Sequence, residues 1–115
     1  MVLWIGFDLQ AEIEAVGVEN CTALHLAAAF GKETVSAQLL QAGASVSAVA
    51  DGGQTPLHVA AYNGETSIAN LLLQANASPT AVNKYGYTPA QHAKQQGHVD
   101  LAAMLLEAEQ SAALK

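Results

Sequence analysis

Apolar residues recur along this chain in short stretches whose spacing is that of a helix with one buried face. In the clearest stretch, Ala60 and Ala61 stand three and four residues after Leu57. Thr55 precedes this stretch as an N-cap residue, and Gly64 ends it as a C-terminal glycine. The pattern predicts a short helix between Thr55 and Gly64.

A second apolar stretch follows in the same part of the chain. It holds Ile68 and the leucines at 71–73, and Asn76 closes it because asparagine tolerates the left-handed backbone conformation. Ahead of the first stretch, the glycine-rich residues 51–53 predict a turn. The predicted order of elements is turn, helix, turn, helix.

This order repeats with a period of 33 residues. The capping threonines Thr22, Thr55 and Thr88 stand at this interval, and a glycine follows each of them at the same distance. A fixed period of this length is typical of a solenoid, in which each unit buries its apolar face only by stacking on its neighbours. We therefore expect a single all-α domain over 1–115, with a half repeat at 1–16 and full repeats at 17–49, 50–82 and 83–115, the last acting as a C-terminal cap.

The predicted helices are too short to be stable by themselves. Isolated helices need about 12–15 residues to be even marginal in water. Stacking must stabilise them instead, and a buried leucine contributes about 1.5–3 kcal/mol to such packing. We assign eight leucines to this scaffold rather than to function: Leu24, Leu39, Leu40, Leu57, Leu72, Leu73, Leu105 and Leu106.

Composition and charge limit the classes of partner that we expect the protein to bind. The chain has a formal net charge of −6, and its four basic residues are lysines scattered singly along it, so nucleic acid is not an expected partner. The one cysteine cannot form an internal disulfide, which fits a reducing compartment. No apolar run approaches the ~20 residues that cross a bilayer, and the apolar opening at 1–7 lacks the basic leader of a signal peptide. We expect an intracellular, cytoplasmic protein that does not bind membranes.

Candidate chemistry in the sequence is weak. His25 and His58 take the same place in successive units, but stacked helices lie about 8–10 Å apart, too far for two ligands of one zinc ion. Cys21 and His25 stand four residues apart, yet no third residue orients the imidazole as nucleophilic catalysis requires. We expect no catalytic residue, no metal and no cofactor.

The residues 55–61, Thr-Pro-Leu-His-Val-Ala-Ala, resemble the ankyrin repeat, and 22–28, Thr-Ala-Leu-His-Leu-Ala-Ala, are a close variant. The third unit departs from the motif, since Ala90-Gln91 stands in place of the usual Leu-His pair, and the N-terminal unit lacks its first helix. The resemblance implies an ankyrin-repeat solenoid of helix pairs with projecting hairpins. It also implies that the motif histidine braces the hairpin backbone, and that the protein is a non-enzymatic module binding a partner through hairpin tips and the inner helix face.

In this chain the implied binding positions carry most of the aromatic side chains. Aromatic residues dominate the energetics of protein interfaces, so we hypothesise that four of them anchor a protein partner. The alternative is that Tyr85 and Tyr87 only pack on their own hairpin. The predicted partner-binding residues are Phe30, Asp51, Gln54, Tyr62, Asn63, Lys84, Tyr85, Tyr87 and Gln95.

The expected function is that of an adaptor, inhibitor or scaffold. One alternative is a purely structural ankyrin segment of a longer chain. Another is a homodimer formed through the residues near the N-terminus, which are more apolar than the polar outer face that terminal units of such arrays need. The main expectation is a monomer, in which these residues pack on the first full unit.

Overall fold

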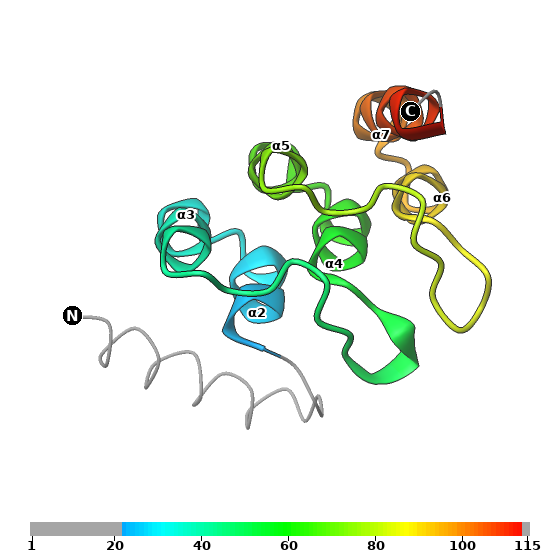
Figure 1. Ribbon diagram of the computed structural model, residues 1–115. Helices are drawn as coiled ribbons and strands as arrows, with labels where there is room; N and C mark the ends of the chain where they lie inside the picture. The colour runs from blue at the N-terminus through cyan, green and yellow to red at the C-terminus, as the bar shows by residue number, and fades with distance from the viewer. Residues whose placement is uncertain (1–21, 114–115) are drawn as a thin grey trace.

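A computed structural model of the chain describes residues 22–113, and within them the chain is helical (Figure 1). The six helices are α2 (Ala23–Ala29), α3 (Glu33–Gln41), α4 (Pro56–Asn63), α5 (Thr66–Gln74), α6 (Pro89–Gln95) and α7 (Val99–Ala113), with a short 3-10 turn, η1, at Asp51–Gly53. No strand occurs among these residues, and one isolated bridge joins Ala50 to Gln54. The predicted all-α fold is confirmed. The predicted half repeat at 1–16 lies outside the described residues.

The helices lie in two rows (Figure 1). An inner row holds α2, α4 and α6, an outer row holds α3, α5 and α7, and each inner helix packs on the outer helix that follows it. Along the rows α2 packs on α4, α4 on α6, and α3 on α5. The core is therefore a layer that runs the length of the array, as the stacking argument predicts.

Each inner helix begins at a capping box formed by a threonine and the residue three positions later. At α4, Thr55 accepts a hydrogen bond on its hydroxyl from the backbone N–H of His58, and Pro56 takes the first helical position. Gly64 ends this helix with a φ of 72°, which an L side chain rarely adopts. Asn76 follows α5 with a φ of 73°. The predicted start and end signals are thus confirmed in this unit.

The core consists of leucines separated by alanines that let the helices approach closely. Leu57 and Leu72 are fully buried, and so is Leu105. Leu106 is 47% exposed, so its assignment to the buried scaffold is wrong. The reason is positional, because Leu73 occupies the same place one period earlier and packs against the core, whereas no helix pair follows α7 among the described residues.

Candidate partner-binding face

Two backbone turns project from the inner row, one at 50–54 ahead of α4 and one at 83–87 ahead of α6 (Figure 1). We call them the first and second turn. In the second turn, the N–H of Asn83 donates to the carbonyl of Tyr87 at 3.0 Å, and the N–H of Lys84 donates across to the carbonyl of Gly52 at 2.9 Å. A Cβ on Gly53 would stand 2.9 Å from the Lys84 nitrogen. Glycine at 53 therefore allows the two turns to stack backbone on backbone, which fixes the spacing of the residues they present.

The motif histidines fasten each turn to the helix before it. His58 Nε2 lies 2.8 Å from the Tyr87 carbonyl oxygen, which can only accept, so this nitrogen donates. His58 Nδ1 then accepts from the Thr55 N–H at 3.3 Å and from its hydroxyl at 2.8 Å. His25 repeats the arrangement, with Nε2 2.7 Å from the Gln54 carbonyl. The brace implied by the resemblance is thus present, and both nitrogens of each ring are committed to it.

Burial disfavours the charged form of these rings. Desolvation lowers the pKa of His25, and the hydrogen bond to Gln54 offsets this only in part. Desolvation likewise lowers the pKa of His58, again against the opposing hydrogen bond to Tyr87. A neutral ring matches the pattern of one donating and one accepting nitrogen. Within 22–113 no group of three potential metal ligands occurs.

The predicted aromatic residues divide into two groups. Phe30 at the end of α2, Tyr62 in α4 and Tyr85 in the second turn are 42%, 48% and 63% exposed. Tyr87 is half-buried, and its ring stands edge-on to that of His92 with centroids 5.7 Å apart. The Lys84 amine lies 5.5 Å from the centroid of the Tyr85 ring. Tyr87 thus packs within the fold, while the other three present open surface.

Three predicted residues meet around one hollow of about 260 Å³ between α4 and α6. Gln54, Tyr62 and Asn63 line it together with Val59 and His92, and we call it the His92 hollow. The amide of Asn63 donates to the Val59 carbonyl at 3.1 Å. The remaining predicted residues do not line this hollow, although Asp51, Lys84 and Gln95 are exposed as well.

Two residues of this hollow, Val59 and His92, were not predicted from the sequence, and His92 is the one that can form hydrogen bonds through its side chain. His92 is 8% exposed, and its ring stands edge-on to three others, with centroids 5.6 Å from His58 and 5.7 Å from Tyr62 and Tyr87. Desolvation lowers its pKa. One signal was available, because the positions 33 and 66 residues earlier hold Val59 and Leu26, so a histidine here breaks an apolar series.

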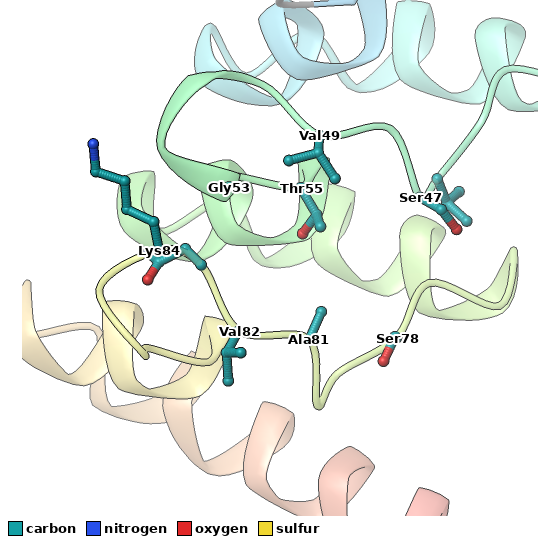
Figure 2. A pocket seen from close by; sticks show the side chains of 10 residues that line it. Ser47, Val49, Gly53, Thr55, Ser78, Ala81, Val82 and Lys84 are labelled. Carbon is teal, nitrogen blue, oxygen red and sulfur yellow. The ribbon is translucent and has the colours of Figure 1, made fainter.

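A second hollow, of about 380 Å³, lies between the chain segments that lead into the two turns (Figure 2). Val49 from one segment and Val82 from the next line it, and both are more than half exposed. Of the predicted binding residues only Lys84 reaches it. It is therefore separate from the surface formed by the inner helices.

Comparison with known families assigns the fold. A family model described as ankyrin repeats, three copies, matches residues 3–83 and 24–115. No curated protein matches the chain. Among the described helices none is long and apolar enough to span a bilayer.

Proposed function

Because this chain belongs to the ankyrin repeat family, we propose that it acts as a non-enzymatic adaptor, inhibitor or scaffold for another protein. Ankyrin repeats are in general modules for protein–protein interaction. We propose that the partner contacts the two turns and the adjoining ends of the inner helices. The proposed contact residues are Phe30, Asp51, Gln54, Tyr62, Asn63, Lys84, Tyr85, Tyr87 and Gln95.

The exposure of three aromatic side chains carries the proposal. Phe30 and Tyr62 follow one another along the ends of α2 and α4, and Tyr85 extends the series onto the second turn. The whole chain has only one Trp, three Tyr and two Phe. Because the chain has so few aromatic residues, the exposure of three of them to water supports a surface that a partner covers.

The charges of this surface favour a partner without strong charge. Its proposed charged residues are Asp51 and Lys84, which oppose each other in sign. The other proposed contacts are aromatic or amide side chains, which bind through area and hydrogen bonds. Such a surface supports a protein partner over nucleic acid, which requires clustered cations.

Paired capture experiments test the proposal. The wild-type chain, immobilised through its C-terminus, is compared with a variant carrying Tyr62→Ala and Tyr85→Ala, and with Glu107→Gln on the exposed side of α7 as a control. A hot spot contributes about 2 kcal/mol or more, so the loss of one anchor should reduce affinity about thirtyfold and the loss of both should reduce it further. Quantitative mass spectrometry of the bound proteins measures the effect. Unchanged capture by the double variant, equal to the control, contradicts the proposal.

The oligomeric state and the cellular location of the protein are also proposals. We propose a cytoplasmic monomer, and the single cysteine supports a reducing compartment. Homodimerisation through the N-terminal residues, or a structural place within a longer chain, are the alternatives. Those residues lie outside the described ranges, so sedimentation over a concentration series is the measurement that separates monomer from dimer.

A further inference from the structure

We propose that the His92 hollow accepts the uncharged side-chain amide of an Asn or Gln residue from the partner protein. This inference rests on the proposed function, because it assumes a protein partner on the inner helix face. It assigns a polar specificity site within a surface whose proposed anchors are aromatic.

The first step is the position of the proton on His92. The Asn83 side-chain oxygen accepts from the N–H groups of Tyr85 at 2.9 Å and Tyr87 at 3.1 Å. The amide nitrogen of Asn83 must then be the atom that faces His92 Nε2 at 2.8 Å, and it can only donate. His92 Nε2 is therefore an acceptor without a proton, and the neutral ring carries its proton on Nδ1.

The second step is that this proton has no acceptor. His92 Nδ1 is buried and makes no hydrogen bond within residues 22–113. Leaving a buried donor unsatisfied costs about 1–3 kcal/mol. His58, in contrast, uses both of its nitrogens. The apolar residues one and two periods earlier, Val59 and Leu26, avoid this cost altogether. An acceptor oxygen brought in by a partner removes it.

The third step is access to the nitrogen. The rings of His58, Tyr62 and Tyr87 stand around His92, and His58 is fully buried and held by its own hydrogen bonds. Tyr62 is 48% exposed and lines the hollow, so its ring has open solvent to turn into. The proposed route to Nδ1 is displacement of this ring by the entering side chain.

The fourth step identifies the occupant. Besides Tyr62, the other polar side chains that line the hollow are the amides of Gln54 and Asn63, each of which contains a donor and an acceptor. No charged side chain lines it among the described residues, so a carboxylate would lose its hydration without gaining a cation. Burial also lowers the pKa of His92, which disfavours an imidazolium that could pair with an anion. A primary amide on an aliphatic stem meets these conditions, with Val59 against the stem.

Nuclear magnetic resonance with a small probe tests the site without the partner. In the chain labelled with ¹⁵N at histidine, we expect the His92 proton on Nδ1 and not on Nε2. Propionamide, which carries the stem and amide of the proposed occupant, should shift the His92 Nδ1 signal saturably. Its charged counterpart propionate should bind about tenfold more weakly or worse, which corresponds to about 1.4 kcal/mol.

The variant His92→Val is the matched control, because valine is the residue of the same position in the preceding unit. It should abolish the saturable shifts that propionamide causes at the Tyr62 and Asn63 amides. A proton found on Nε2, propionate binding as tightly as propionamide, no shift of the His92 signals, or shifts that persist in the variant would each overturn the inference.

Failure of this inference is distinguishable from failure of the proposed function. Tyr85 lies outside the His92 hollow. If propionamide leaves His92 unaffected while Tyr85→Ala still releases the captured partner, only the amide site is wrong. If propionamide binds at His92 and neither Tyr62→Ala nor Tyr85→Ala changes capture, the proposed partner-binding face is wrong.

Discussion

The second and third helix pairs share one sequence frame but differ in what they offer to a neighbour. In the second pair, α4 and α5, His58 caps its own helix and also bonds the Tyr87 carbonyl of the next turn. In the third pair, α6 and α7, Gln91 takes this position. Its side-chain oxygen accepts from the Thr88 N–H at 2.9 Å, and the residue is otherwise exposed. One position thus performs two separable tasks, and glutamine keeps only the local one.

The glycines that follow the inner helices show the same difference. Gly64 and Gly97 both have positive φ, 72° and 83°. A Cβ at Gly64 would stand 2.7 Å from the His98 ring of the third pair, whereas a Cβ at Gly97 would meet nothing within 4 Å. Glycine is therefore required at 97 by conformation alone, and at 64 by conformation and by the approach of the next pair.

The largest expected effect on stability is the difference between truncating a buried leucine and truncating an exposed leucine of the last helix. Leu72→Ala removes a fully buried side chain from α5 and should lower the free energy of unfolding by about 2–5 kcal/mol. Leu106→Ala, in the exposed face of α7, should cost less than about 1 kcal/mol, because half of that side chain is already in water. Urea denaturation measures both. Equal losses would contradict the view that α7 closes the described array on that side.

The next effect separates the two tasks of the motif histidine. His58→Gln keeps a side chain that can cap α4 but removes the imidazole donor to the Tyr87 carbonyl, which then keeps only the Asn83 N–H. The loss of this hydrogen bond should cost about 1–1.5 kcal/mol. The reciprocal change, Gln91→His, should alter stability by less than about 0.5 kcal/mol, since surface substitutions away from such features usually do. Urea denaturation again measures the difference. A cost for His58→Gln as small as that of Gln91→His would mean that the bond between units contributes nothing.

Lowering the pH should reveal how much the buried motif histidines contribute to the free energy of unfolding. Burial lowers the pKa of His25 and of His58 in the folded chain below the value of 6.5 for a free ring. Above pH 6.5 the ring is neutral in both states and its full contribution is present. As the pH falls below 6.5 the unfolded chain takes up protons first, so the free energy of unfolding decreases down to the folded-state pKa.

The measurement is the urea midpoint as a function of pH for the wild type and for His58→Gln. Glutamine does not titrate, so the variant should lose part of the decrease between pH 6.5 and the lower values. Gln91→Leu, which changes no titrating group, is the control and should keep the whole decrease. A variant curve parallel to the wild-type curve would show that His58 is not a source of the acid sensitivity.

Much of the fold could be predicted because its signals are local. The roles of Thr55, Gly64 and Asn76 could be predicted, because each acts through its own backbone conformation or its own helix end. The exposure of Leu106 was mispredicted, because an apolar residue in phase with Leu73 is buried only if a further unit covers it.

The candidate site was harder to predict, because its hollow depends on contacts between units. His92 was not among the predicted site residues, and its neighbours His58 and Tyr62 lie about 30 residues away in the sequence. Gln54, Tyr62 and Asn63 were proposed from their places in the repeat, and the structure brings them together. Tyr87 was proposed in the same way but packs on His92. Position in a repeat thus predicts which surface a residue belongs to, while its burial depends on the residue that occupies the neighbouring unit.

The smallest expected effect compares a buried hydroxyl with an exposed one. Ser36 is fully buried in α3, and its hydroxyl makes no hydrogen bond within residues 22–113. The same position holds Ala69 and Ala102 in the two following units, and both are buried. Ser36→Ala should therefore raise the free energy of unfolding, by about 1 kcal/mol, because it removes an unsatisfied polar group.

Alanine also favours the helix more than serine does, so a matched control is needed. Ser67→Ala, at an exposed position of α5, measures the gain from helix propensity alone and should be limited to about 0.5 kcal/mol. Thermal and urea unfolding of both variants separate the two contributions. If Ser36→Ala stabilises the chain no more than Ser67→Ala, the Ser36 hydroxyl has an acceptor. The serine then gives α3 a hydrogen bond that α5 and α7 lack, and does not destabilise it.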